Sequence, residues 1–192
     1  MTRLRSLRNR GQAMVEFAII LPFLMLVLLT ILEFGFVFSH HVTMEYATRE
    51  GARMGAALAH GSTAFNCNEV DDQVVAAVQR VLVASGYQID INQVTEIRIY
   101  KADAAGQEQG EVNVWTLGNG PPVDGANLLF KESSNTWDAC TRDNSGFGFT
   151  DSIGISLGYD YRYVTPLGNM LGLVGNPVLP MTDRTIMALN PS

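Results

Sequence analysis

The chain has 192 residues and a formal net charge of -6, which leaves room for one modest domain beyond any membrane segment. Its positive charge is polarised, because four of the 13 lysines and arginines lie within the first ten residues and the rest of the chain is acidic overall. This distribution argues against a nucleic-acid-binding protein, whose basic residues would line a face of the folded domain.

An apolar segment follows the arginine-rich N-terminus. Residues 17–38 contain a single charge, Glu33, and as a helix these 22 residues would extend for about 33 Å, enough to cross the hydrocarbon core of a bilayer. The arginines before the segment predict a cytoplasmic N-terminus and an extracytoplasmic C-terminal domain. A secretory signal is the competing interpretation, but its shorter apolar core should end at small residues, where this chain has Glu33, Phe34 and Phe36.

The helical pattern continues beyond the apolar segment, because residues 40–60 contain no proline and no turn cluster. We expect one continuous helix of about 45 residues, from near Gln12 to near Ala59, that is far longer than a usual globular helix. Acidic and basic residues lie at helical ion-pair spacing in Glu45 with Arg49 and in Glu50 with Arg53.

Small residues recur every four positions on this stem, at Ala47, Gly51 and Gly55. Such a ridge lets another backbone approach closely. The ridge can pack on the chain's own domain or against another subunit, and the first is slightly favoured.

The remaining sequence predicts an α+β domain. The first expected element is an amphipathic surface helix, with Asn68 as its N-cap and an apolar stripe that ends before Gly86. Alternating patterns then predict strands at 94–101, 111–117 and 153–163, of which the first two form a hairpin, and a final strand at 181–189. Residues 118–152 are rich in Gly, Pro, Asn, Asp and Ser, and we expect mostly irregular structure there.

Two cysteines, Cys67 and Cys140, both fall on the extracytoplasmic side in this topology, where a disulfide could persist. Two free thiols are the alternative.

The sequence gives little support for an enzyme. Its three histidines, His40, His41 and His60, all lie on the stem and are expected to be solvated. We find no catalytic triad pattern, no metal-binding motif and no nucleotide-binding loop. We therefore predict no catalytic residues, no metal site and no cofactor.

A carboxylate near the start of the apolar segment, Glu16, needs an explanation, because a charge that reaches the bilayer centre costs on the order of 2.5–3.5 kcal/mol. Its simplest place is the headgroup region, balanced by Arg10 and by the helix N-terminus. Gly11 lies five positions before it, and Phe17 directly follows it.

The segment GQAMVEF at 11–17, after a basic leader and before an apolar helix, resembles the class III signal of type IV pilins and pseudopilins. In the form GQAMVEFAIILPFL it most resembles the TadE-like pseudopilins of the tight-adherence (Flp pilus) system. The resemblance continues in YATREGARMGAALA from Tyr46, in EIRIYKAD from Glu96 and in YDYRYVTPL from Tyr159.

This resemblance implies a pilin-like fold, in which a long N-terminal transmembrane helix continues into a stem that packs on a mainly antiparallel sheet, with one further surface helix. It also implies that a prepilin peptidase cuts between Gly11 and Gln12. Glu16 would then be the fifth residue of the mature chain and, with Phe17, would serve recognition and assembly by pairing with the N-terminal amine of a neighbouring subunit.

The expected organisation is a cytoplasmic leader at 1–11, a transmembrane helix at 12–38, a stem at 39–61 and an extracytoplasmic domain at 62–192. The expected function is that of a non-enzymatic minor pilin-like subunit in assembly of a Flp-type pilus or related secretion apparatus. Its partners would be a prepilin peptidase, other pilin or pseudopilin subunits, an inner-membrane assembly platform and membrane lipid, without nucleic acid. The alternative is an unprocessed membrane-anchored domain that binds a ligand or surface through residues 118–152.

Overall fold

The computed structural model describes residues 3–59, 66–84, 89–145, 150–170 and 178–190. The contacts of the chain divide it into two compact units. The first consists of Met1–Phe38 and Arg162–Val178, and the second consists of Ser39–Tyr161 and Leu179–Ser192.

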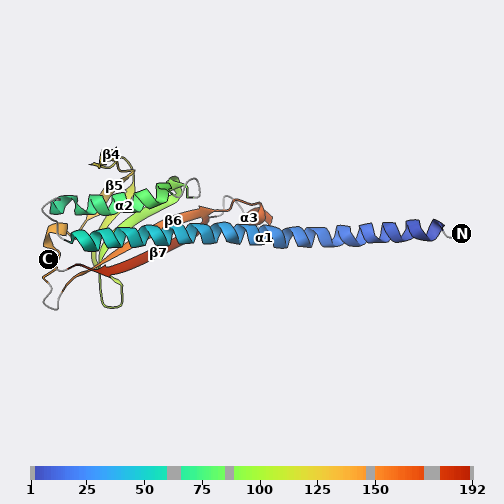
Figure 1. Ribbon diagram of the computed structural model, residues 1–192, viewed down its shortest axis with the longest axis horizontal. Helices are drawn as coiled ribbons and strands as arrows, with labels where there is room; N and C mark the ends of the chain where they lie inside the picture. The colour runs from blue at the N-terminus through green and yellow to red at the C-terminus, as the bar shows by residue number, and fades with distance from the viewer. Residues whose placement is uncertain (1–2, 60–65, 85–88, 146–149, 171–177, 191–192) are drawn as a thin grey trace. The chain divides into compact units, whose positions relative to one another are not determined.

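One long helix, α1 (Arg3–Leu58), contains both the predicted membrane segment and the predicted stem (Figure 1). It begins earlier than the expected start near Gln12 and ends next to the expected residue, Ala59. Pro22 lies inside the helix, where its missing N–H removes one backbone hydrogen bond without ending the helix. The ion pairs predicted from the spacing of acidic and basic residues are present, Glu45 with Arg49 and Glu50 with Arg53.

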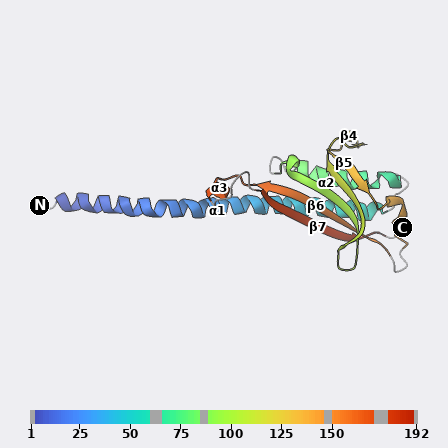
Figure 2. The same ribbon diagram turned by 180° about the vertical axis from the view of Figure 1, so that it is seen from behind.

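The second unit contains a five-stranded antiparallel sheet in the order β5-β2-β1-β6-β7 (Figures 1 and 2). Its strands are β1 (Val94–Ala102), β2 (Glu108–Leu117), β5 (Phe130–Asn135), β6 (Ser152–Arg162) and β7 (Val178–Ala188). The predicted hairpin is confirmed, because β1 pairs antiparallel with β2 and places Ile97 opposite Trp115. On its other side β1 pairs with β6, which places Ile97 opposite Leu157.

The core of this unit lies on the sheet face that the stem part of α1 and the helix α2 (Val70–Ala84) cover (Figure 1). The alternation in β6 directs its large apolar side chains to this face, so that every second residue from Ile153 to Tyr161 is almost fully buried. The arrangement confirms the expected α+β fold, with one long helix and one further helix on an antiparallel sheet.

Residues 118–152 contain more regular structure than the sequence predicted. The strand β5 lies in this segment and extends the sheet beyond β2, and a small hairpin is formed by β3 (Pro122–Val123) and β4 (Ala126–Asn127). Five of the six β5 residues are exposed, so the strand lacks the apolar alternation by which strands are recognised. It is held instead by backbone pairing with β2 and by the Ser133 hydroxyl, which donates to the Val114 carbonyl oxygen at 3.0 Å.

Asn68, the expected N-cap of α2, lies instead inside a short 3-10 turn that precedes this helix. Asn66 caps a short 3-10 turn, Cys67–Glu69, and its side chain accepts a hydrogen bond from the Asn68 N–H. The helix α2 begins directly after this turn. Both asparagines suit a cap chemically, so composition alone could not choose between them.

Candidate membrane helix and assembly segment

The apolar part of α1 has the length and composition of a membrane-spanning helix. The segment of α1 from Gly11 to Leu58 contains an 18-residue window of mean hydropathy 2.7, and none of that window is buried within the structure. Large apolar side chains such as Ile19 and Phe23 are about 70% exposed. In water such a surface would be unfavourable, so the segment is suited to a lipid or a protein environment.

The residues of the signal-like segment lie on this exposed helix. Gln12 donates a side-chain hydrogen bond from Nε2 to Oε1 of Glu16 at 2.9 Å, one helical turn away. Phe17 is 59% exposed, and Gly11 has no heavy atom near the position a Cβ would occupy. The structure thus leaves Glu16 and Phe17 accessible for contacts outside this chain.

The small-residue ridge packs inside the second unit. Ala47 is fully buried, and a Cβ built on Gly51 would lie 2.6 Å from Cγ2 of Val78 on α2. A Cβ on Gly55 would lie 2.5 Å from Cδ1 of Ile153 on β6. The glycines therefore let the stem approach both α2 and the sheet, which is the first of the two packing modes that the spacing left open.

Gly51→Ala is expected to destabilise the second unit by about 1–2 kcal/mol, because overpacking costs about 1–3 kcal/mol and the better helix propensity of alanine returns up to about 1 kcal/mol. Val78 is β-branched and stiff within its helix, so it cannot easily rotate away. Urea unfolding of the detergent-solubilised chain, followed by fluorescence of the buried Trp115 and Trp137, measures the effect.

The control is Gly35→Ala on the same helix, where nothing lies within 4 Å of the added carbon. This variant should unfold at the same urea concentration as the unmodified chain or at a slightly higher one, because alanine favours the helix and meets no neighbour. Equal stability of the Gly51 and Gly35 variants would contradict close packing at Gly51.

Cys67 and Cys140 form a disulfide in this structure. It joins the turn before α2 to the 3-10 turn Ala139–Thr141, which follows β5. The bond therefore ties residues 136–142 to the N-terminal end of α2.

His40 differs from the solvated stem histidine that the sequence predicted. Its exposed fraction is only 9%, and its ring lies 5.1 Å from the ring of Tyr161 and 5.6 Å from that of Tyr159. His41 is exposed as predicted, and His60 lies outside the described residues. Adjacent positions on a helix point to different faces, but only the packing of β6 decides which face is covered.

Glu33 is a functional candidate that the sequence analysis noted only as the single charge of the apolar segment. Its exposed fraction is 3%, and its two carboxylate oxygens accept hydrogen bonds from the backbone N–H groups of Val164 and Thr165. The partners are more than 130 positions away in the chain, so no local pattern could have indicated them.

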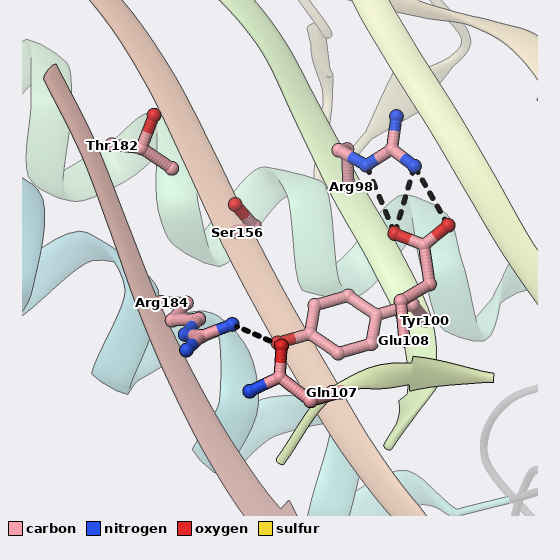
Figure 3. A pocket seen from close by; sticks show the side chains of 7 residues that line it. All are labelled: Arg98, Tyr100, Gln107, Glu108, Ser156, Thr182 and Arg184. Atoms are coloured by element: carbon pink, nitrogen blue, oxygen red, sulfur yellow. Dashed lines mark hydrogen bonds and ion pairs between the residues drawn. The ribbon is translucent and has the colours of Figure 1, made fainter. Parts of the chain in front are cut away.

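A polar groove of about 450 Å³ lies on the sheet of the second unit (Figure 3). It is lined by Arg98, Tyr100, Gln107, Glu108, Ser156, Thr182 and Arg184. None of these residues belongs to 118–152, the segment that the sequence offers as a binding surface.

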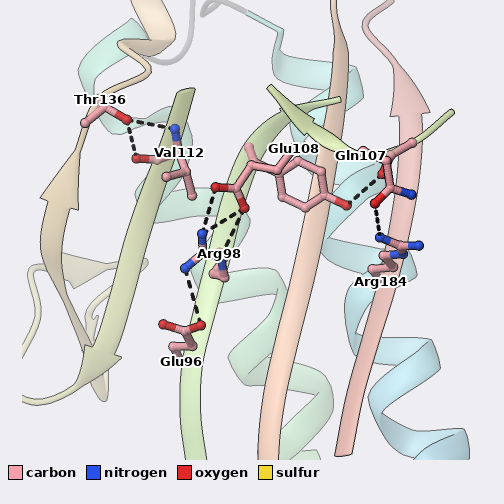
Figure 4. Close-up of polar contacts among 9 residues, drawn as sticks. Glu96, Arg98, Gln107, Glu108, Val112, Thr136 and Arg184 are labelled. Carbon is pink, nitrogen blue, oxygen red and sulfur yellow. Dashed lines mark hydrogen bonds and ion pairs between the residues drawn. The ribbon is translucent and has the colours of Figure 1, made fainter. Parts of the chain in front are cut away.

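The charges of the groove are largely satisfied within the chain (Figure 4). Nη2 of Arg98 lies 2.8 Å from both carboxylate oxygens of Glu108, and a second carboxylate, Glu96, lies 3.4 Å from Nη1. The Glu108 carboxylate raises the pKa of Arg98 above its ordinary value. Arg184 donates to the side-chain oxygen of Gln107 at 3.2 Å. An anionic ligand would have to compete with these contacts, so the groove by itself does not indicate a ligand.

Comparison with known proteins finds a similarity in the N-terminal part of the chain. A family model described as TadE-like protein matches residues 11–53, which include the signal-like heptad, the apolar helix and the start of the stem motif at Tyr46. The strand motifs at 96–103 and 159–167 lie outside the matched range. No curated protein and no solved structure matches the chain. Residues 11–53 of the chain are therefore similar to the TadE-like protein family.

Proposed function

We propose that this chain is a minor pilin-like subunit that takes part in assembly of a Flp/Tad-type pilus or a related secretion apparatus, without enzymatic activity. The match of residues 11–53 to the TadE-like family model suggests a role in Tad/Flp pilus assembly in general terms. The observation that carries the finer proposal is the exposed apolar helix with Glu16 near its start, joined to a folded domain by a continuous stem.

In this proposal, a prepilin peptidase cuts after Gly11 and releases a new amine at Gln12. A carboxylate in a low-dielectric environment is costly unless it is paired, so the amine of a neighbouring subunit is a favourable partner for Glu16. The pair would set the axial register between two helices. The same apolar surface would serve first as a membrane anchor and later as a packing surface between subunits.

The purified chain is expected to begin at Gln12, and mass spectrometry of its N-terminal peptide tests this directly. Gly11→Ala should block the cut and leave the leader attached. Glu16→Ala should be cut normally and should fail to co-purify with the assembled apparatus, because its partner amine loses the carboxylate.

The matched control is Glu45→Ala, which removes an exposed carboxylate of the stem. Among the described residues, Arg49 is its ion-pair partner. It should be cut and assembled like the unmodified chain. An intact N-terminus or a cut beyond Phe38 would contradict the proposed cleavage. Normal assembly of the Glu16 variant would contradict the proposed pairing with an amine.

The second candidate is an unprocessed membrane-anchored domain that binds a ligand or surface. Besides residues 118–152, the groove beside Arg184 is a surface where such a ligand could bind, in competition with the contacts that its charged groups make within the chain. An unprocessed N-terminus together with ligand binding that is lost in Arg184→Ala would support this candidate over the first.

A further inference from the structure

The buried carboxylate of Glu33 ties a distant turn to the apolar part of α1. Its Oε1 accepts the N–H of Val164 at 3.0 Å, and its Oε2 accepts the N–H of Thr165 at 2.8 Å. The next residue, Pro166, has no N–H, and the Thr165 hydroxyl accepts from the N–H of Leu167 at 3.3 Å. The turn between β6 and the short helix α3 (Leu167–Met170) is therefore fixed on α1 through its backbone, and both views show α3 beside α1 (Figures 1 and 2).

Only one face of the helix is covered at this level. Leu29 and Val37, one turn before and after Glu33, are partly buried. The neighbouring Phe34 and Phe38 are 70% and 60% exposed. The helix thus keeps an exposed apolar surface at the same level along its axis as the turn at Val164 and Thr165.

The position of Glu33 along α1 matches the thickness of a bilayer. The 21 steps from Gln12 to Glu33, at 1.5 Å each, give about 32 Å, and a hydrocarbon core is about 30 Å thick. A helix whose Gln12 lies at the cytoplasmic boundary therefore carries Glu33 at the outer boundary. A carboxylate and two backbone N–H groups can be placed there at low cost because they satisfy one another.

The bound turn itself has the side chains of a membrane interface. Val164 is 65% exposed although it is apolar, and Tyr163 is half-buried. Arg162 is exposed, and none of the ion pairs of the described residues includes it. An exposed valine beside an amphipathic tyrosine and a guanidinium suits the boundary between acyl chains and phosphates.

We propose that residues 162–169, held by Glu33, form a second contact with the membrane, in which Val164 and the nearby phenylalanines enter the outer lipid interface and Arg162 meets lipid phosphates. This inference rests on the membrane anchoring proposed above. In this arrangement the membrane-spanning part of α1 ends near Leu32, before the expected boundary at Phe38. Glu33 is then a positioning residue for the lipid contact.

The test uses the full chain with a nitroxide label at Val164→Cys, reconstituted in vesicles of phosphatidylethanolamine and phosphatidylglycerol. Collision with oxygen and with an aqueous nickel chelate gives the depth of the label. We expect a depth of about 5–10 Å below the phosphate level, as for other interfacial segments. Labels at Phe23→Cys and Val83→Cys are the deep and the aqueous references, since both side chains are exposed in this chain.

The second variant adds Glu33→Ala to the labelled Val164→Cys chain, which removes both acceptors and should move the label into water. Glu33→Gln keeps one acceptor oxygen and should restore part of the depth. A Val164 label as accessible to nickel as the Val83 label would overturn the inference. So would a label shielded from both reagents, which would indicate a protein partner at this turn.

Carbonate extraction of the same vesicles separates this inference from the proposed function. A chain that resists extraction but leaves the Val164 label in water contradicts the lipid contact and leaves the anchor intact. A chain that is extracted contradicts both.

Discussion

Replacing Asp71 with alanine is expected to destabilise the second unit by about 3–5 kcal/mol, because it leaves a buried guanidinium without its counter-charge. The Arg142 side chain is fully buried, and its Nη2 lies 2.7 Å from Oδ1 of Asp71. Oδ2 of the same carboxylate accepts from the Asn113 side-chain amide at 2.6 Å. Arg142 also lies 4.3 Å above the ring of Trp137. Urea unfolding followed by tryptophan fluorescence measures the loss, which is a large part of a typical stability of about 5–15 kcal/mol.

A double variant, Asp71→Ala with Arg142→Met, distinguishes the cost of leaving one buried charge unpaired from the net contribution of the ion pair. Apolar replacements of both partners are often neutral or stabilising, so the double variant should regain much of the stability that the single variant loses. A single variant that loses less than about 1 kcal/mol would show that the pair is not isolated from water.

The neighbouring Asp72 provides the matched control. Burial, followed by repulsion from Asp71, Glu132 and Glu69, raises the pKa of Asp72 to about 6. A carboxyl whose pKa is higher in the folded than in the unfolded chain costs stability as it ionises, so its contribution falls as pH rises from about 4 to 6. Asp72→Asn should therefore be neutral or stabilising by about 1 kcal/mol at pH 7, and it should weaken this pH dependence.

Removing the disulfide with the double variant Cys67→Ala, Cys140→Ala is expected to cost about 4 kcal/mol. The two cysteines are 73 positions apart, and release of so long a loop raises the entropy of the unfolded chain. Cys140 is exposed, so a reductant can reach the bond. Urea unfolding of the oxidised and the reduced chain gives the same comparison without a substitution.

The double cysteine variant itself should be insensitive to the reductant, which controls for other effects of the reagent. An unmodified chain whose unfolding midpoint does not change on reduction would contradict the expectation. The disulfide and the Asp71–Arg142 pair tie the same residues, 136–142, to the start of α2, so we expect their effects to be less than additive.

Local patterns in the sequence were sufficient for much of the fold. The uninterrupted apolar run predicted the long helix, and the alternation around Ile97 and Tyr159 predicted β1 and β6. The heptad that begins at Gly11 led to the same family whose model matches residues 11–53. These features depend on neighbours within about two turns of helix or a few positions of strand, so they are visible in the sequence itself.

The tertiary structure alone decided the features whose partners are distant in the chain. β5 is a strand because β2 offers it a free edge, and His40 is buried because the tyrosines of β6 lie over it. Asp71 meets Arg142 across 71 positions, and Glu33 meets Val164 across 131. No periodicity links such residues, since the burial of a polar group depends on which surfaces pack together. The sequence therefore predicted a long apolar helix with a segment similar to one family, and the tertiary structure showed which residues pair with the buried charges.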